Sequence, residues 1–145
     1  MTFQTGAYEL QMRRALQLAH AQPVYDAEDP PVGAVLYGPA GEEIVAAFSD
    51  RHRTGDPTAD AVMLAVRHAG LARESWRLEG CTLVTTLEPG TMSAGAIVLA
   101  RISRLVIGSW DRRNGAVCSL WDVVRDSRLN HSVEVIPGIL ERECG

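Results

Sequence analysis

The 145-residue chain is predicted to fold as an α/β protein, a three-layer α/β/α sandwich around a five-stranded mixed sheet. The main observation is the order of helical and β-rich stretches, α-β-β-α-β-α-β-α-β, because strand-helix-strand units form right-handed parallel crossovers. The second is composition, since 46% apolar and 22% charged residues are typical of a globular domain. The length then predicts that residues 1–145 form a single domain.

The first half of the chain is expected to form one helix and one pair of strands. A helix is predicted at about 5–22, followed by a turn-rich connection at 22–31. Two β-rich runs at 32–38 and 43–49 are joined by the Gly-bearing connection 39–42, whose hairpin length predicts antiparallel pairing. The apolar stripe that indicates the helix is formed by Tyr8, Met12, Ala15, Leu16 and Ala19.

The second half begins with a loop at 51–58, in which Asp56 or Thr58 is expected to cap the next helix. That helix starts within the segment DPTADAVML, and its apolar stripe is Val62, Ala65, Val66 and Ala69. The later elements expected are a strand at 81–88, a helix at 89–102, a strand at 104–110, a loop at 111–117, a helix at 119–127, a strand at 133–138 and a short helix at 139–144. The helix at 89–102 is apolar on all sides, so it is expected to be buried.

Charge and cysteine usage exclude several classes of protein. The net charge of −4 excludes a protein-wide positive field for nucleic acid, so RNA contacts must come from local clusters. Cys81, Cys118 and Cys144 are odd in number and widely spaced, which indicates free thiols in a reducing compartment. The amino-terminal stretch does not have the pattern of a signal peptide, and a cytoplasmic protein without membrane contact is expected.

Motifs along nearly the whole chain resemble those of one enzyme family. They are MRRALQLA, PVGAVL, GDPTA, LEGCTLVTTLEPGTMSAGAIVLARISRLVIG and GAVCSLWDVVRDSRLNHSVEV. The chain resembles the zinc-dependent cytidine and deoxycytidylate deaminase superfamily, and within it the bacterial tRNA adenosine deaminases. The resemblance implies a cytidine-deaminase-like fold and a homodimer with the helix at 89–102 near the interface.

The residues that carry chemistry in that family are replaced in this chain. In the family, one His and two Cys bind Zn²⁺ and a Glu two residues after the His transfers protons. The matching positions hold Asp60 for the His, Val62 for the Glu, and Gly90 and Ser93 for the cysteines. The family's base-contacting Asn falls on Ser49. These residues predict that the zinc site is lost, that no cofactor is bound, and that hydrolytic deamination is absent.

Whether the former reaction centre is open or collapsed does not follow from the sequence, although Val62 favours partial closure. Two helix starts converge on the old metal position, so Asp60 is expected to point toward the other helix and hydrogen-bond to Ser93 or a nearby amide. Val62 would add apolar filling. Glu88 is expected to hydrogen-bond the loop backbone rather than act as a lone base. The vestigial pocket is predicted to consist of Ser49, Asp60, Val62, Glu88, Gly90 and Ser93.

Two polar groups have alternative interpretations. Asp50, His52, Asp56 and Asp60 could bind a different cation, although caps and solvated groups are the favoured interpretation. The loop SWDRRNGAV matches the loop that meets the anticodon stem-loop in tRNA deaminases, and it suits phosphate and 2′-hydroxyl contacts. Binding without turnover and mere inheritance of the fold both explain its retention. The RNA-binding candidates are Asp111, Arg112, Arg113, Asn130 and His131.

Three functions therefore follow from the sequence, in this order. The first is a catalytically inactive pseudo tRNA adenosine deaminase that binds tRNA or another RNA, or regulates an active partner. The second is an enzyme with altered, zinc-independent chemistry from Asp60, Glu88 or the Asp50 and His52 group. The third is a purely structural partner subunit. A homodimer and a pairing with an active deaminase both remain open.

Overall fold

The computed structural model describes residues 2–24 and 29–145, with side chains from residue 6 onward. The middle of the connection expected at 22–31 lies outside the described residues. The centre of the fold is a five-stranded sheet, as predicted, and its strand order is β2-β1-β3-β4-β5. Its strands are β1 (Gly33–Tyr37), β2 (Glu43–Phe48), β3 (Thr82–Leu87), β4 (Arg104–Ser109) and β5 (Glu134–Ile136). β1 is antiparallel to both β2 and β3, whereas β3, β4 and β5 are parallel, so the sheet is mixed.

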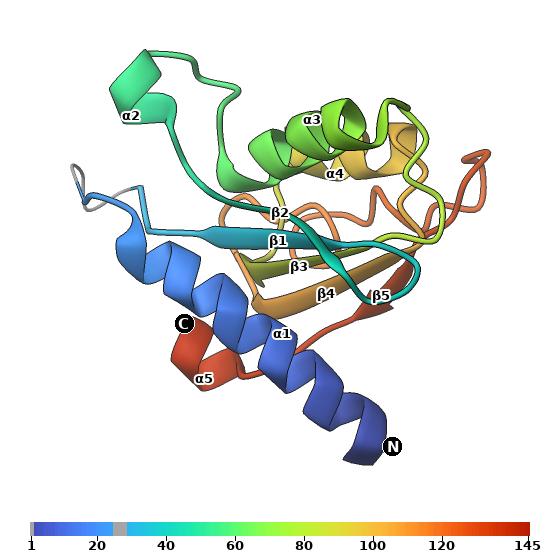
Figure 1. The fold of residues 1–145 in the computed structure, drawn as a ribbon, viewed down its shortest axis with the longest axis horizontal. Coiled ribbons are helices and arrows are strands. Elements are labelled where there is room, and N and C mark those ends of the chain that lie inside the picture. Colours follow the sequence, from blue (N-terminus) through green and yellow to red (C-terminus); the bar gives the residue numbers. More distant parts are fainter. Residues whose placement is uncertain (1, 25–28) are drawn as a thin grey trace.

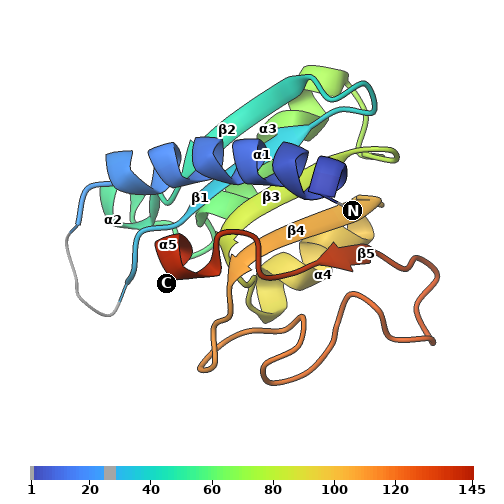
Figure 2. The same cartoon turned by 90° about the horizontal axis from the view of Figure 1, so that it is seen from below.

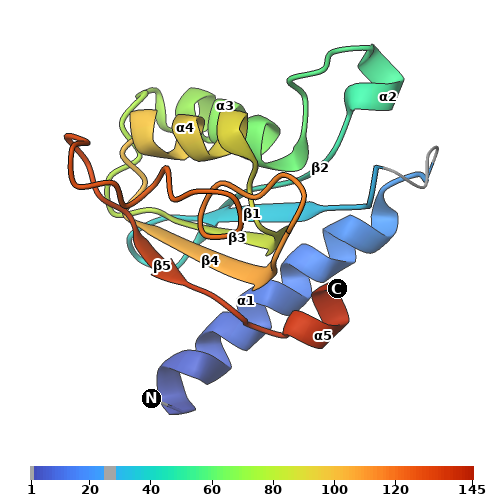
Figure 3. The same cartoon turned by 180° about the vertical axis from the view of Figure 1, so that it is seen from behind.

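Helices cover both faces of this sheet (Figure 1). α1 (Thr2–Ala21) and α5 (Glu141–Cys144) lie on one face, and α3 (Ala61–Arg73) and α4 (Thr91–Leu99) lie on the other (Figures 2 and 3). The four-residue helix α2 (Arg51–Thr54) projects at the margin of the α3 side. The predicted α/β/α sandwich is therefore confirmed. Over the described part of the chain, no helix is long and apolar enough to cross a membrane.

The core has two layers because successive strand residues face opposite sides of the sheet. Leu36 and Leu83 are buried against α3 and α4, whereas their neighbours Val35 and Val84 are buried against α1. All four side chains have no exposed surface. Burial on both faces explains why β1 reads as a continuous apolar run rather than an alternating one.

The helix predicted at 119–127 is absent, and that prediction was wrong. The segment forms turns and bends. The amides of Val117, Cys118 and Ser119 all donate to one carboxylate, that of Glu88. These amides lie just before and within the first turn of the expected helix, and the shared bond turns the chain toward β3. A partner 29 or more residues away has overridden local helix propensity.

Two further predictions need correction. The stretch expected to be a loop at 51–58 contains α2, and the cap of α3 is Asp60 rather than Asp56 or Thr58. Asp56 instead accepts the amide and hydroxyl of Thr58 in a local turn. The helix at 89–102 was expected to be buried, but Leu99 of α4 is 72% exposed. Only one side of α4 packs on the sheet.

Candidate functional site

A cavity of about 340 Å³ lies between the starts of α3 and α4 and the ends of β3 and β4. Ligand sites in α/β sheets commonly lie beyond the carboxyl ends of parallel strands, which is where this cavity opens. All six residues of the predicted pocket line it, and so does Asp111. Its polar lining is completed by Asp29, Arg51, Thr91 and Asn114.

Asp60 connects the two helices that form the floor of the cavity. Its Oδ1 accepts a 2.8 Å hydrogen bond from the amide of Met63, which caps α3. Its Oδ2 accepts a 2.7 Å hydrogen bond from the hydroxyl of Ser93 in the first turn of α4. The predicted contact between Asp60 and Ser93 is thus confirmed. The carboxylate is occupied on both oxygens, which holds the two helix starts together.

Val62 and Gly90 complete the floor without adding polar atoms. Val62 is 4% exposed and belongs to the core cluster under α3. Gly90 is the N-cap residue of α4 and makes no side-chain cap. Its backbone forms an isolated antiparallel bridge with Gly115, which fixes the loop after β4 against the start of α4.

Glu88 organises the loop that follows β4. Its Oε2 accepts from the amides of Val117, Cys118 and Ser119 at 3.1, 2.7 and 2.9 Å, and its Oε1 accepts from the amide of Asp111 at 3.0 Å. The hydroxyl of Ser119 also donates to Oε1. The side chain is 2% exposed. Backbone hydrogen bonding, the role expected for this residue, is therefore present.

The ionisation of Glu88 follows from these contacts. Burial raises the pKa of Glu88, but the hydrogen bonds from Ser119, Cys118 and Asp111 lower it by more, so the net pKa lies below its usual value. The hydrogen-bond donors stabilise the charged form. Glu88 is consequently a buried anion that uses its acceptor capacity on the loop.

The predicted RNA-contact residues separate into two places. Asp111 lines the cavity, and its Oδ1 accepts from the amides of Arg113 and Asn114 at 3.1 and 3.2 Å, which shapes the turn. Arg112 and Arg113 are exposed beside it. His131 lies elsewhere, because its Nε2 is 2.6 Å from the carbonyl oxygen of Ile102, beyond the opposite end of α4.

Asn130, next to His131, is exposed and does not line the cavity. The structure therefore brings three of the five RNA-binding candidates together and leaves two apart.

Two residues that line the cavity, Asp29 and Arg51, were missed by the sequence analysis. Arg51 donates through Nη2 to Oδ1 of Asp29, and Nε2 of His52 lies 3.2 Å from Oδ2 of the same carboxylate. The sequence shows Arg51 beside Arg53, which suggested a solvated pair. Only the fold reveals that Arg51 faces the cavity whereas Arg53 bonds to Asp50.

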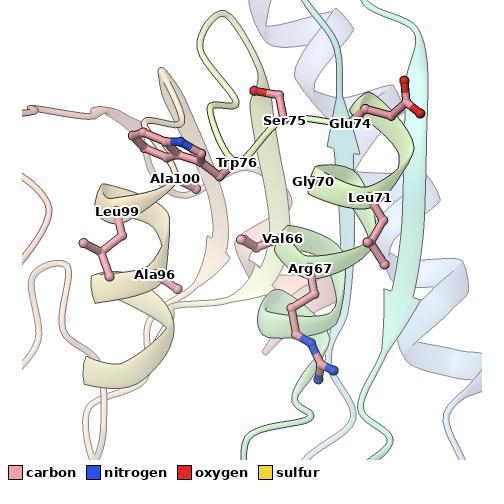
Figure 4. A pocket seen from close by; sticks show the side chains of 10 residues that line it. All are labelled: Val66, Arg67, Gly70, Leu71, Glu74, Ser75, Trp76, Ala96, Leu99 and Ala100. Atoms are coloured by element: carbon pink, nitrogen blue, oxygen red, sulfur yellow. The ribbon is translucent and has the colours of Figure 1, made fainter.

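A second hollow, of about 880 Å³, lies between α3 and the end of α4, away from the cavity (Figure 4). Leu71, Leu99 and Trp76 line it, and each is more than half exposed. The guanidinium groups of Arg77 and Arg101 lie 4.7 and 6.0 Å from the Trp76 ring centre. The hollow is mostly apolar and contains no residue of the predicted pocket.

The sheet order and the cavity between two helix starts define an α/β protein with a ligand-sized site beyond the ends of its parallel strands. A family model described as the cytidine and deoxycytidylate deaminase zinc-binding region matches residues 6–109. The chain belongs to this family.

Curated relatives extend the comparison to most of the chain. A tRNA-specific adenosine deaminase from Bacillus subtilis is 40% identical over 137 residues, covering 94% of this chain and 83% of the relative. The Haemophilus influenzae protein of the same name is 40% identical over 136 residues, covering 94% and 78%. A solved structure from work on A-to-I editing by tRNA:A34 deaminases has a TM-score of 0.83 at 35% identity and covers 92% of this chain and 94% of that one.

These comparisons correct the prediction of a catalytically inactive protein. The relatives that match along almost the whole chain are named as enzymes, and they point to a deaminase. The prediction that no cofactor is used is contradicted as well, because the matched family region is described as zinc-binding. Altered chemistry and a purely structural role have no support among these relatives.

The residues at the cavity floor differ from those that bind the zinc implied by the family. Structural and catalytic zinc sites use three or four Cys, His or carboxylate ligands. The matching positions provide the Asp60 carboxylate, the neutral Ser93 hydroxyl and no side chain at Gly90, and Asp60 already accepts from Ser93. This donor set does not fit a zinc ion.

Proposed function

We propose that this chain acts on adenosine in tRNA, as a deaminase. The observation that carries the proposal is the 40% identity to tRNA-specific adenosine deaminases over 94% of the chain. The reaction of that class adds water at the ring carbon that bears the amino group, and ammonia leaves. The proposal assigns to the residues of this chain the binding of the RNA and the enclosure of the base.

The cavity supports a nucleobase as the group that enters. Its volume of about 340 Å³ falls at the small end of ligand pockets. A base must leave its stack to enter such a cavity, and unstacked loop bases are the usual targets of sequence-specific RNA recognition. Met92, Val62 and Pro89 supply apolar surface, while Asp111 and Asn114 supply polar groups at the rim.

The loop after β4 supports RNA as the larger ligand. Arg112 and Arg113 are exposed and follow Asp111, which lines the cavity, so the loop that borders the cavity carries two guanidinium groups. Guanidinium groups bind phosphate oxygens through paired hydrogen bonds. Because the whole chain carries a net charge of −4, this local pair gives the RNA a defined approach.

We also propose a homodimer formed through the hollow of Figure 4. Leu71, Trp76 and Leu99 expose a contiguous apolar surface, and such surfaces commonly mark interaction sites. Light scattering is expected to give the dimer mass. The substitution Leu99→Arg is expected to give the monomer mass, and a monomer before substitution would overturn this assembly.

Free thiols at Cys81, Cys118 and Cys144 suit a cytoplasmic protein.

The test of the function is inosine formation in tRNA. The full chain, expressed with zinc in the medium, is incubated with bacterial tRNA, and the tRNA is digested to nucleosides for mass spectrometry. Inosine is expected to rise with time. The double substitution Arg112→Ala and Arg113→Ala should slow the reaction on tRNA, and Arg142→Ala, an exposed substitution on α5, should not. Tight binding of tRNA with no inosine would overturn the proposal.

A further inference from the structure

The cavity is lined by more acidic than basic side chains. Four carboxylates face it, those of Asp29, Asp60, Glu88 and Asp111. Among the described lining residues, Arg51 is the single basic side chain. A nucleic acid that enters an acid-lined cavity is repelled unless a cation receives its phosphate groups. Arg51 is therefore the side chain whose charge matters most to a polyanionic ligand here.

The guanidinium of Arg51 is held in place but not saturated. Nη2 donates to Asp29, and the backbone amide of Arg51 is 3.4 Å from the hydroxyl of Ser49, another lining residue. The Nε atom is buried and has no hydrogen-bond partner within the described residues. A buried donor without a partner is costly, so the hydrogen-bonding capacity of this guanidinium is not used up inside the protein. The side chain as a whole is 41% exposed, so a ligand can reach its exposed part, although Nε itself is buried.

We propose that Arg51 binds a phosphate of the nucleotide whose base enters the cavity, an inference that rests on the proposed function. Asp29 orients the guanidinium, whose exposed N–H groups can donate to phosphate oxygens. Planar guanidinium donors match phosphate oxygens in pairs, which adds direction to the charge attraction. The contact would fix the sugar-phosphate at the mouth of the cavity while the base lies on the Asp60 side.

Arg53 provides a matched control on the same short helix. It donates through Nε and Nη2 to the two oxygens of Asp50 at 2.7 and 2.5 Å, and its side chain is 70% exposed. It does not line the cavity. Substitution of Arg53 removes the same formal charge from nearly the same place, so it reports the general electrostatic effect alone.

The experiment measures binding of tRNA, adenosine, adenosine 5′-monophosphate and adenosine 3′-monophosphate to the full chain. Charge-assisted hydrogen bonds of this kind correspond to roughly tenfold to hundredfold in affinity. Arg51→Ala is expected to weaken the binding of tRNA and of one of the two monophosphates by about that factor. The affinity for adenosine is expected to stay unchanged. Arg51→Lys should recover part of the loss, and Arg53→Ala should change affinity less than about threefold. The slope of log affinity against log salt should fall by about 0.7–0.9 for Arg51→Ala on tRNA.

The outcomes separate the two proposals. If the unmutated chain binds neither tRNA nor the nucleotides, the proposed function and this inference both fall. If it binds them and Arg51→Ala keeps the same affinity and salt slope, only the inference falls. An equal loss for adenosine and the monophosphates would show that Arg51 merely shapes the cavity, and would also overturn it. Thermal unfolding of each variant confirms that a loss of binding is not a loss of fold.

Discussion

The hydroxyl of Ser93 donates a 2.7 Å hydrogen bond to Oδ2 of Asp60, and this bond joins the first turns of α4 and α3 across 33 residues of sequence. The other oxygen of Asp60 caps α3 through the amide of Met63. One side chain thus fixes a helix start and the distance between two helices. Removing it affects both.

The substitution Asp60→Ala is expected to lower the free energy of unfolding by about 2–3 kcal/mol, because it removes an N-cap and leaves the buried Ser93 hydroxyl without its acceptor. Ser93→Ala should cost less, since Asp60 keeps its cap. Urea unfolding of both single variants and the double variant gives the coupling, expected at about 0.5–1.5 kcal/mol. Additive effects of the two substitutions would show that the hydrogen bond contributes nothing.

The substitution Glu88→Gln is expected to lower the free energy of unfolding by about 2–4 kcal/mol at neutral pH. The amide retains one acceptor oxygen, and its NH₂ group faces amide donors that then lack a partner. Circular dichroism during chemical unfolding measures the effect. Glu79→Gln is the control, because Glu79 is exposed and bonds only to the side chain of Arg77. Equal stability of the two variants would contradict the role of Glu88.

The same residue predicts a pH dependence with a definite sign. The pKa of Glu88 is lowered in the folded chain, so folding favours its ionised form. Its contribution is fully present above the unfolded-state pKa, near 4.3, and is lost as pH falls through the lower folded pKa. As the pH falls below about 5, the free energy of unfolding of the native chain should therefore decrease more than that of the Glu88→Gln variant. Parallel acid-unfolding curves would contradict this.

The substitution Gly115→Ala should be destabilising by about 1–3 kcal/mol, because a Cβ there meets the carboxylate of Glu88 and the carbonyl oxygen of Asp111. Gly95→Ala in α4 is the matched control. A Cβ at Gly95 has nothing within 4 Å, and alanine favours a helix interior by about 1 kcal/mol over glycine. Opposite shifts in thermal midpoint are expected, and shifts of the same sign would count against the described loop packing.

Thiol modification should follow burial. Cys118 is exposed, whereas burial raises the pKa of Cys81 and raises that of Cys144 to about 11. At pH 8 a maleimide is expected to label Cys118 first, with Cys144 and Cys81 labelled slowly, because the thiolate is the reactive form. Peptide mapping by mass spectrometry gives the order. Early labelling of Cys81 would contradict its position in the core.

The residues at the cavity floor predict that zinc affinity can be gained by substitution. The combination Asp60→His, Gly90→Cys and Ser93→Cys introduces an imidazole and two thiolates, the ligands that Zn²⁺ prefers. This variant is expected to bind zinc at least about a hundredfold more tightly than the natural chain in competition with a chromogenic chelator. The single substitution Ser93→Cys should give a much smaller gain. Equal affinities of the triple variant and the natural chain would show that these positions do not converge on one point.

Much of the fold could be predicted because its pattern is local. The apolar run of β1, the β-rich composition of β3, the hairpin connection and the stripe of α1 each depend on neighbours in sequence. The segment 119–127 could not be predicted, since its amides are claimed by Glu88 from a different strand. Likewise, the exposed side of α4 follows from how few residues pack over Leu99, which the sequence of the helix does not reveal.

The candidate site was predicted in part for a similar reason. A resemblance transfers positions that the family shares, so Ser49, Asp60 and Glu88 were placed in the cavity. Arg51 was missed, because its role depends on the side of α2 that faces the cavity and on an anchor at Asp29. The prediction of an inactive protein from four replaced side chains was also wrong, because it is contradicted by relatives matched over 94% of the chain.

The hydrogen bonds to Glu88 also affect how the loop after β4 can recognise a ligand. With the amides of residues 117–119 already engaged inside the protein, the loop after β4 meets its ligand in a shape settled during folding. A preformed surface loses little conformational freedom on association. An RNA hairpin that binds as proposed would therefore have to adapt to the protein, and the loop would discriminate among hairpins by their geometry.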